Sequence, residues 1–460
     1  MKTAAIVLAA GAGTRMKSKK PKVAHEMMGK PLVNWVIDAA KAAGMDKVVT
    51  VVGHGREQVE PLLADGTQVV VQPERLGTAD AVNVCREAFA DFDGSLLVLS
   101  GDCPLITPET MAALLQKRSE SNAAVVVLTM QPEDPTGYGR IIRDEGGAVL
   151  RIVEQKDATP EEAAVAECNA GVYCFDARTL FDALEKVGSD NNQGEFYLTD
   201  VLEICRRAGR AVLALPARDD TECLGVNSRI QLAEATKIAQ RRINEAHMAA
   251  GVTMLDPDQV WIGPDVVIEP DVELKPQVFL FGHTVVGEDS VVGPNSRLTD
   301  TVVGCACVVD ETVAVHAQID DHASCGPRAY LRPGAHLCVG AKAGTHVEIK
   351  KSTIGPGSKV PHLSYVGDTT MGAGVNMGAG SITCNYDGKH KFPTVIGDNV
   401  FVGSSTMLVA PVTVGDGAVI GAGSVIARDV TADALALTRP EQKEFEGWAQ
   451  KKREEFAKEG

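Results

Sequence analysis

The chain has 460 residues, with 61 Asp and Glu against 45 Lys and Arg, which gives a formal net charge of −16. This length exceeds one ordinary hydrophobic core, so two or more domains of roughly 100–200 residues are expected. An acidic chain without a basic block argues against a nucleic-acid surface, because phosphate neutralisation needs clustered Lys and Arg. A cleft for a small anion remains allowed. Since the chain has 45 Gly but only 11 Phe, 6 Tyr and 3 Trp, something other than aromatic packing must fill part of the interior.

The sequence predicts a cytoplasmic protein. Its apolar start, residues 1–10, is broken by Gly11 before a signal peptide could develop, and no run of about 18 apolar residues occurs. The eleven Cys are an odd number without a CxxC pair, which argues against a disulfide framework or a zinc knuckle. We expect buried or inert thiols.

Residues 1–227 alternate short β-rich runs with helix-like segments, which predicts an α/β domain with a largely parallel, Rossmann-like sheet. The expected strands are 4–10, 47–53, 68–72, 95–100 and 123–130. Residues 228–250 contain no Gly or Pro and have apolar residues three and four apart, so we expect one linker helix, capped by Asn227 or Ser228.

Residues 251–460 form the expected second domain, in which an aliphatic residue recurs at about every sixth position from Ile262 to Ile426, the pattern of a parallel β-helix. Of the 45 Gly, 24 lie in residues 251–430, where they would fill corners that leave no room for a Cβ substituent. The expected series slips near residues 354–382. Its inward residues are Ile262, Ile268, Leu274, Leu280, Val286, Val292, Leu298, Val303, Val309, Val315, Ile319, Cys325, Leu331, Leu337, Ala343, Ile349, Ile396, Val402, Leu408, Val414, Ile420 and Ile426.

Two segments depart from this repeat. Residues 384–393 are polar and turn-rich, and insertions in solenoids map to loops that often form the binding face. Residues 440–460 are charged and helix-prone, and we expect them to form a mobile tail rather than a site.

A glycine-rich loop follows the first expected strand. In Gly11-Ala12-Gly13-Thr14-Arg15 the glycines allow backbone N–H groups to approach phosphate oxygens, and Arg15 and Lys22 would supply cationic donors to the same anion. No Gly-Lys-Ser/Thr follows and a third glycine is missing, so this is neither a Walker loop nor a full dinucleotide fingerprint. A plain strand-to-helix turn remains the alternative.

Further along the domain, a tight turn at residues 76–81 and the segment Ser100-Gly101-Asp102 follow expected strands. An Asp at a strand's carboxyl end lies where open α/β sheets bind ligands. Its carboxylate suits Mg²⁺ carried with nucleotide phosphates. The alternative role for Asp102 is a helix cap or a turn.

Together these motifs resemble those of sugar-nucleotide pyrophosphorylases. The order of motifs over residues 3–440 resembles the bacterial bifunctional N-acetylglucosamine-1-phosphate uridyltransferase and glucosamine-1-phosphate acetyltransferase family, which implies a left-handed β-helix in the second domain. The motifs that carry this resemblance are Leu8–Met16 with Pro21-Lys22, Leu76–Ala79, Gly101–Leu105, Thr136–Ile141, Ile152–Asp157, Gly225–Asn227 and Asn385–Gly388.

The resemblance implies site residues in the first domain. Arg15 and Lys22 would bind and polarise the UTP triphosphate, and Asp102 with Asn227 would ligate one or two Mg²⁺ ions. The remaining substrate contacts implied for UTP and N-acetylglucosamine 1-phosphate are Leu8, Ala9, Ala10, Gly11, Lys22, Gln72, Gly77, Thr78, Gly139, Glu154, Asn169 and Asn227. The sugar phosphate is already largely ionised at neutral pH, with a second pKa of about 6, so the reaction needs charge neutralisation and alignment rather than a strong base.

Three positions depart from the family pattern. Arg75 stands where Gln is frequent, Asp80 where His is common, and Ala12 where Lys is frequent. Arg75 is therefore kept out of the expected site, and strictness for UTP over other nucleotides is left open.

The second domain gathers cations and polar residues that a solenoid does not need for its fold. Acetyl transfer to an amine needs a base with a pKa near 7 and an oxyanion donor, and the resemblance assigns the base to His362. It also implies a homotrimer with active sites between subunits. The implied ligands are Arg332, Lys350, Tyr365 and Asn376 for glucosamine 1-phosphate, and Ala379, Asn385, Tyr386, Ser404, Ala422 and Arg439 for acetyl-CoA.

Two enzymatic hypotheses follow. The first is a bifunctional enzyme that acetylates glucosamine 1-phosphate and then uridylylates the product, with small molecules as its only partners besides its own copies and no contact with nucleic acid or membrane. The alternative is a single-activity sugar-1-phosphate nucleotidyltransferase whose β-helix regulates or oligomerises. A β-helical structural or ice-binding protein would need regular Thr ladders, and the sequence shows none.

Overall fold

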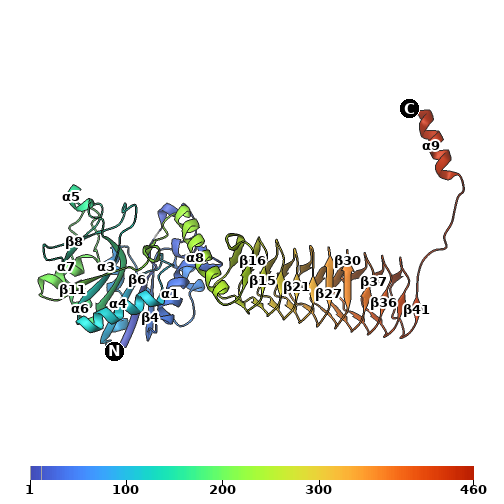
Figure 1. Ribbon diagram of the computed structural model, residues 1–460, viewed down its shortest axis with the longest axis horizontal. Helices are drawn as coiled ribbons and strands as arrows, with labels where there is room; N and C mark the ends of the chain where they lie inside the picture. The colour runs from blue at the N-terminus through green and yellow to red at the C-terminus, as the bar shows by residue number, and fades with distance from the viewer. Residues whose placement is uncertain (1, 12, 460) are drawn as a thin grey trace. The chain divides into compact units, whose positions relative to one another are not determined.

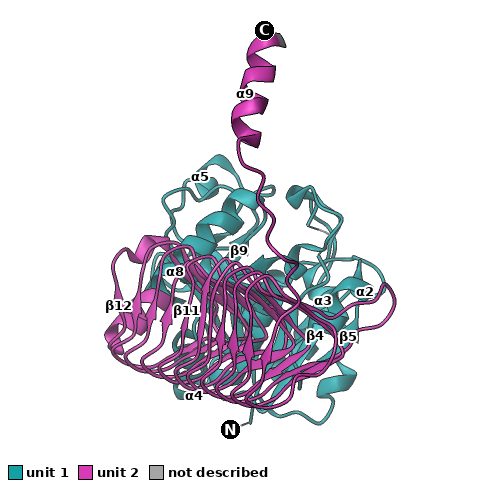
Figure 2. Ribbon diagram, turned by 90° about the vertical axis from the view of Figure 1, so that its right-hand side faces the viewer, with its two compact units in different colours: residues 1–242 teal, residues 243–460 magenta. Residues whose placement is uncertain are grey.

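The computed structural model describes residues 2–11 and 13–459, so Met1, Ala12 and Gly460 lie outside the described part. The chain divides into two compact units, residues 1–242 and 243–460 (Figure 2). Helix α8 (Arg229–Ala249) contains the point of division. None of the described helices is long and apolar enough to span a membrane.

Unit 1 is an α/β domain built on a nine-stranded sheet (Figure 1). Its main path runs β11-β7-β10-β6-β1-β4-β5, with β8 (Arg140–Arg143) and β9 (Val149–Val153) attached through β10. The strands of the path are β1 (Lys2–Leu8), β4 (Lys47–Val52), β5 (Gln68–Val71), β6 (Gly94–Ser100), β7 (Val125–Met130), β10 (Cys168–Asp176) and β11 (Val212–Pro216).

The five strands expected from the sequence are confirmed, although β1 runs over Lys2–Leu8 rather than 4–10. Parallel pairing joins β6-β1-β4-β5 and also β11-β7, whereas β10 runs antiparallel between β6 and β7. Two apolar cores bury the sheet, one on each face. The main helices are α1 (Leu32–Ala42), α3 (Thr78–Asn83), α4 (Pro108–Ser121), α6 (Ala177–Leu184) and α7 (Asp200–Arg207).

The open choice of cap for α8 is resolved by its hydrogen bonds. Ser228 Oγ accepts a hydrogen bond from the backbone N–H of Gln231 at 3.2 Å, the N-cap arrangement. The Asn227 side chain points elsewhere, since its Oδ1 accepts from Lys22 Nζ at 2.9 Å. Ser228 is therefore the cap, and Asn227 is left for the site described below.

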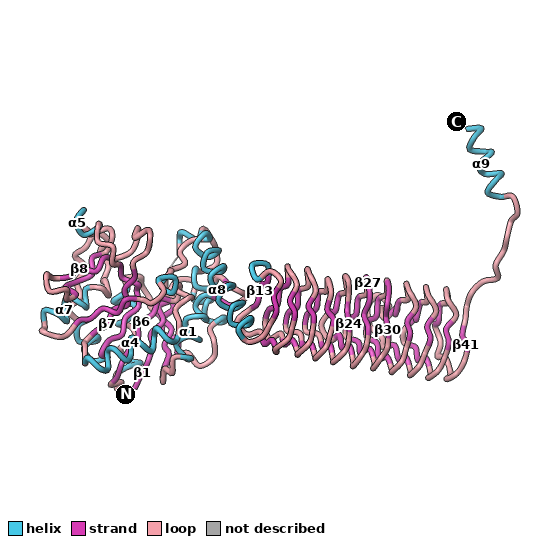
Figure 3. The backbone as a smooth tube through the Cα atoms, in the orientation of Figure 1, coloured by secondary structure: helices cyan, strands magenta, loops and turns pink. Residues whose placement is uncertain are grey.

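Unit 2 is a left-handed parallel β-helix whose strands form three flat faces. Figure 3 shows its coils stacked one after another. We call the eleven-stranded sheet from β12 (Thr253–Met254) to β41 (Leu435–Ala436) face 1, and the ten-stranded sheet from β13 (Val260–Ile262) to β40 (Val425–Ile426) face 2. Face 3 is the nine-stranded sheet from β14 (Val267–Ile268) to β38 (Val412–Val414). Each strand pairs in parallel with the strand one coil further on.

The aliphatic series lines the interior as predicted, with one correction. At β22 (Val313–Val315) the fully buried residue is Ala314, whereas Val315 is partly exposed. The spacing shortens there to five residues on each side, from Val309 to Ala314 and from Ala314 to Ile319, because a corner is one residue shorter. The slip expected near 354–382 is a shortening of the spacing to five residues, from Ile349 to Ile354 and from Val366 to Met371. The inward series itself continues without a break through buried Ile354, Val360, Val366, Met371, Met377 and Thr383.

Close stacking of coils explains the glycines. A Cβ added to Gly344 would lie 2.0 Å from the carbonyl oxygen of Pro361 on the next coil, and one on Gly403 would lie 2.4 Å from the backbone nitrogen of Ala422. Residues 385–393 leave the coil between β34 (Ile382–Cys384) and β35 (Thr394–Ile396), confirming the insertion. The C-terminal segment contains helix α9 (Trp448–Glu459).

We predict that Gly344→Ala lowers the free energy of unfolding of the β-helix by about 3 kcal/mol, the upper range for overpacking a rigid interior. The matched control is Gly340→Ala. Gly340 has open space around its Cβ position but a φ of +68°, so it should cost only about 1 kcal/mol through backbone strain. Urea denaturation followed by circular dichroism measures both, and equal effects would contradict the role of coil spacing.

Candidate active sites

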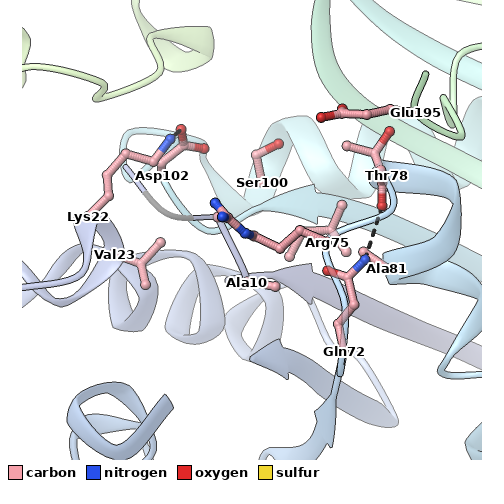
Figure 4. Close-up of a pocket in the computed structure, with 13 residues that line it drawn as sticks. Ala10, Lys22, Val23, Gln72, Arg75, Thr78, Ala81, Ser100, Asp102 and Glu195 are labelled. Atoms are coloured by element: carbon pink, nitrogen blue, oxygen red, sulfur yellow. Dashed lines mark hydrogen bonds and ion pairs between the residues drawn. The ribbon is translucent and has the colours of Figure 1, made fainter. Parts of the chain in front are cut away.

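A cavity of unit 1 opens at the carboxyl ends of β1 and β6, whose last residues, Leu8 and Ser100, are paired in register. The glycine loop and the Gly101-Asp102 turn therefore leave the sheet at the same edge, where open α/β sheets bind ligands. The cavity has a volume of about 500 Å³ (Figure 4). It is lined by Leu8, Ala10, Gly11, Lys22, Val23, Gln72, Arg75, Gly77, Thr78, Ala81, Ser100, Asp102 and Glu195.

Lys22 joins the two residues expected to bind a metal. Its Nζ donates to Asp102 Oδ2 and, at 2.9 Å, to Asn227 Oδ1. The Val226 N–H bonds the Asp102 carbonyl at 2.8 Å and so holds the two segments together. Gly13, at φ +60°, permits this approach, since its Cβ would lie 2.5 Å from that of Lys22. Because both oxygens are directed at one cationic point, and carboxylate and amide oxygens suit a hard divalent ion, these residues fit Mg²⁺.

The Gln72 carboxamide is held in one orientation. Its Nε2 lies 2.7 Å from Asp80 Oδ2 and 3.2 Å from the carbonyl oxygen of Gly77, and both of these partners only accept hydrogen bonds. The donor end of the amide is therefore committed to them, and Oε1 is left toward the cavity. In Figure 4 this oxygen lies on the side of Ala10, away from Thr78 and Ala81.

The segment around Phe196 closes one side of the cavity and was missed from the sequence. Phe196 forms backbone hydrogen bonds with Leu76 (2.8 Å) and Ala79 (2.9 Å). Gly77 is required there, since its φ is +124° and a Cβ would lie 2.4 Å from the Phe196 oxygen. The Thr78 hydroxyl accepts from the Leu198 N–H at 3.0 Å, so it anchors the same segment.

Three polar lining residues, Arg75, Ser100 and Glu195, were not among those expected. Arg75 departs from the family pattern and was not expected at the site, yet its side chain extends across the cavity (Figure 4). Glu195 had no sequence signal, because it reaches the cavity only through the pairing of Phe196 with Leu76. Ser100 could have been found as the last residue of the strand that precedes Asp102.

Arg15 lines a second cavity, of about 480 Å³, rather than the first one, which Lys22 lines. Glu154 and Lys156 line this cavity too. Gly139 and Asn169 lie close by, since the Asn169 N–H bonds the Gly139 carbonyl at 2.8 Å and a Cβ on Gly139 would lie 3.5 Å from Glu154 Oε1. The structure thus groups Gly139, Glu154 and Asn169. Ala9 is not among the residues that line the first cavity; it is buried, and its N–H donates to the Val51 carbonyl.

The Glu154 carboxyl is in an environment that disfavours its charge. Burial raises its pKa, a hydrogen bond from the Thr199 hydroxyl at 3.5 Å opposes this, and the nearby charges of Asp157 and Asp200 add to the increase. A polar ligand that donates hydrogen bonds to this carboxylate would relieve the penalty.

In unit 2 the expected phosphate ligands meet at the corner between faces 2 and 3. Arg332 follows β25 (Tyr330–Leu331), and Lys350 ends β28 (Glu348–Lys350) on the next coil. Arg332 pairs with Glu348 at 2.9 Å, and Lys350 Nζ lies 3.2 Å from Asp368 Oδ2. The Asn385 Nδ2 donates to the same Asp368 oxygen at 2.6 Å.

Asp368 and Lys391 also belong to this cluster, and neither was among the expected substrate ligands. Asp368 looked like an ordinary corner residue in the sequence, and only the coil register places it between Lys350 and Asn385. Lys391, on the inserted loop, has its pKa lowered by the hydrogen-bonded contact with Lys350 and by the charge of that ammonium. Two cations in contact are unfavourable unless an anion joins them, so the corner is suited to a phosphate.

A second group forms a column along the corner between faces 1 and 2. His362 ends β30 (Lys359–His362), and its carbonyl accepts from Gly380 N, next to Ala379 on the following coil, at 3.3 Å. On the following coils, the Ala379 carbonyl accepts a hydrogen bond from the Ser405 N–H at 2.7 Å. The Ser404 carbonyl accepts one from the Gly423 N–H at 2.8 Å. The column thus contains the expected His362, Ala379, Ser404 and Ala422, and the Arg439 side chain reaches Gly421 and Gly423 at its end.

The two groups flank face 2. Tyr365 begins β31 (Tyr365–Gly367), and its hydroxyl extends along that strand to within 2.4 Å of where a Cβ on Gly367 would be. It therefore spans the face between His362 and Lys350. Asn376 lies apart on face 1, in register with Lys359 and Phe401, and Tyr386 is an exposed residue of the inserted loop, where its hydroxyl donates to the Gly388 carbonyl.

Comparison with known proteins agrees with this arrangement. Residues 5–203 match the MobA-like NTP transferase domain family, and residues 393–428 match the bacterial transferase hexapeptide (six repeats) family. The chain is 52% identical to the bifunctional protein GlmU of Pelotomaculum thermopropionicum, covering 99% of both chains. It is 51% identical to that of Lactobacillus gasseri over 95% of both, and 48% identical to that of Caldanaerobacter subterraneus subsp. tengcongensis over 97% of both.

The fold and the two sites therefore define a nucleotidyltransferase domain joined to a hexapeptide-repeat transferase domain. Because the similarity extends over nearly the whole length of these relatives, the chain belongs to the bifunctional GlmU family.

The raised pKa of Glu154 has a measurable consequence. Its folded pKa lies above the unfolded value of about 4.3, so the folded state binds more protons between the two values and this group's contribution to stability falls as pH rises through them. We expect Glu154→Gln to flatten the decline of unfolding free energy above pH 4.3. The exposed Glu161→Gln is the control; urea titrations across pH 4–7 that leave the Glu154→Gln slope unchanged would contradict the assignment.

Proposed function

We propose that the chain makes UDP-N-acetylglucosamine through both of its sites. It is a bifunctional transferase: the β-helix domain acetylates glucosamine 1-phosphate, and the N-terminal domain transfers a uridylyl group to the product and releases pyrophosphate. The observation that carries the two-site assignment is that each unit holds its own lysine-centred anion site, around Lys22 and around Lys350. The alternative, a nucleotidyltransferase whose β-helix only regulates or oligomerises, does not account for the cluster around Lys350.

In acetyl transfer, the substrate amine attacks the thioester carbonyl of acetyl-CoA and the coenzyme A thiolate leaves. We assign His362 as the base that takes the amine proton. Arg332 and Lys350 would hold the sugar phosphate, with Tyr365 lying along the face between them and the base. Asn376 would contact the sugar. The corner column of Ala379, Ser404, Ala422 and Arg439 would carry the coenzyme, and Asn385 and Tyr386 would approach it from the inserted loop.

In uridylyl transfer, a phosphate oxygen of N-acetylglucosamine 1-phosphate attacks the α-phosphorus of UTP and pyrophosphate leaves. Lys22 would neutralise the triphosphate beside the backbone of Leu8, Ala9, Ala10 and Gly11, and Arg15 would act from the neighbouring cavity. Gly139, Glu154 and Asn169 would bind the sugar. A bound Mg²⁺ would be held by Asp102 and Asn227 and would supply further charge neutralisation at the phosphates.

Assembly and location also form part of the proposal. Phe401, Val419 and Leu435 stack in register on three successive coils of face 1 and are 51%, 41% and 66% exposed. Such an apolar row calls for a partner surface, and a homotrimer through the β-helix would supply one. All eleven Cys are free thiols, which suits a reducing cytoplasm.

Two variants test the two-site assignment. We expect His362→Ala to slow coenzyme A release about 100-fold or more, while uridylyl transfer from supplied N-acetylglucosamine 1-phosphate is retained. Asp102→Ala should reduce pyrophosphate release by about 100-fold or more and leave acetylation intact. Separate assays of the partial reactions measure both effects, and a joint loss of the two activities in either variant would contradict independent sites.

A third variant tests base recognition. With Nε2 held by Asp80, Gln72 Oε1 can accept the N3–H of uracil, which cytosine lacks. Asp80→Ala should raise the KM for UTP about tenfold, which corresponds to about 1.4 kcal/mol, and should lower the preference for UTP over CTP. Asp80→Asn keeps an acceptor oxygen and should behave like the unaltered enzyme; the same UTP/CTP ratio in all three proteins would exclude this role.

A further inference from the structure

Three side chains outside both sites converge on the outer surface of face 3. Asp320 directly follows β23 (Gln318–Ile319). On the next coil, His336 lies in β26 (Ala335–Leu337) and Cys338 directly follows β26. The ligand atoms of the three lie within 4.8 Å of one another. Among residues 2–11 and 13–459 this is the one group of three or more His, Cys, Asp or Glu side chains with such a spacing.

The β-helix register produces this convergence. Side chains alternate along a strand, so His336 and Cys338 point outward while Leu337 between them is buried. Since Gln318 pairs with His336 and Ile319 with Leu337, Asp320 lies beside Cys338 on the adjacent coil. The Asp320 N–H bonds the Leu337 carbonyl at 2.8 Å, and the Cys338 N–H bonds that of Ile354 at 2.9 Å, so the ligand backbones are fixed.

We propose that Asp320, His336 and Cys338 form a binding site for a borderline-soft divalent cation of the Zn²⁺ type. Carboxylate oxygen, imidazole nitrogen and thiolate sulfur are the ligands that Zn²⁺ takes, whereas Mg²⁺ and Ca²⁺ prefer oxygen alone. Tetrahedral coordination at the usual bond lengths places such atoms about 3.3–3.6 Å apart. His336 Nε2 lies 2.8 Å from Asp320 Oδ2 and 4.0 Å from Cys338 Sγ, so small side-chain rotations suffice.

The surroundings support a metal site over a simple ion pair. Asp320 Oδ1 accepts from Gln318 Nε2 at 2.8 Å, the kind of outer hydrogen bond that orients a ligating carboxylate. His336 and Asp320 are both partly exposed, at 31% and 26%, so water can complete the coordination. On binding, the thiol proton leaves to solvent, and one thiolate with one carboxylate balances the charge of the cation. The ion would clip two adjacent coils together.

The test uses the full chain, freed of metal with a chelator and titrated with Co²⁺. We expect one equivalent per chain to give a thiolate-to-cobalt charge-transfer band that Zn²⁺ abolishes by displacement. Cys338→Ser should lose the band, and Asp320→Asn should weaken binding at least about tenfold. Cys305→Ser, which removes an exposed thiol elsewhere in unit 2, is the matched control and should retain the band.

Circular dichroism establishes that each variant is folded before titration. No thiolate band in the unaltered protein would overturn the proposal, as would a band that persists in Cys338→Ser or disappears in Cys305→Ser. Unchanged affinity in Asp320→Asn would overturn the three-ligand site. Uridylyl and acetyl transfer should be unaffected in Cys338→Ser, which separates this proposal from the proposed enzymatic function.

Discussion

The backbone hydrogen bonds between successive coils determine most of what unit 2 can do. They fix each strand in register with the next, so residues one coil apart in the sequence lie about 4.8 Å apart. His362 and Ala379 become neighbours in this way, as do Arg332 and Lys350. The close stacking also imposes a steric constraint, because positions such as Gly344 and Gly403 have no space for a side chain. A rigid ladder therefore supplies columns of side chains without any movement of the scaffold.

In unit 1, distant residues are brought together by the shared edge of a parallel sheet rather than by stacked coils. Its parallel strands terminate at a shared edge, and loops that leave the edge bring Lys22, Asp102 and Asn227 together from three distant parts of the chain. Glycines act here through single contacts: Gly13 admits Lys22, and Gly77 admits the Phe196 backbone. Because the side of the cavity is closed by the segment around Phe196, Glu195 enters the site although nothing in its local sequence marks it.

The two sites share a local arrangement despite unrelated folds. In each, a lysine ammonium is paired with an aspartate, and an asparagine side chain bonds one member of the pair: Lys22 with Asp102 and Asn227, and Lys350 with Asp368 and Asn385. The aspartate holds the cation in place and offsets its charge. Under the proposed function, this pairing is how a chain with a net charge of −16 keeps two cationic sites for small phosphates.

The sequence alone determined the architecture, because a six-residue aliphatic period and an alternation of strands with helices each have one stable solution. Its motifs also pointed to Lys22, Asp102 and Asn227 as candidate site residues, and its repeat pointed to the glycines of the coil. Only the tertiary structure decided which of them meet. It placed Ala314 rather than Val315 in the core, Arg15 at a separate cavity, and Asp80, Asp368 and Lys391 beside site residues. These outcomes depend on the length of single corners and on contacts between segments far apart in the chain, and a local pattern does not encode such contacts.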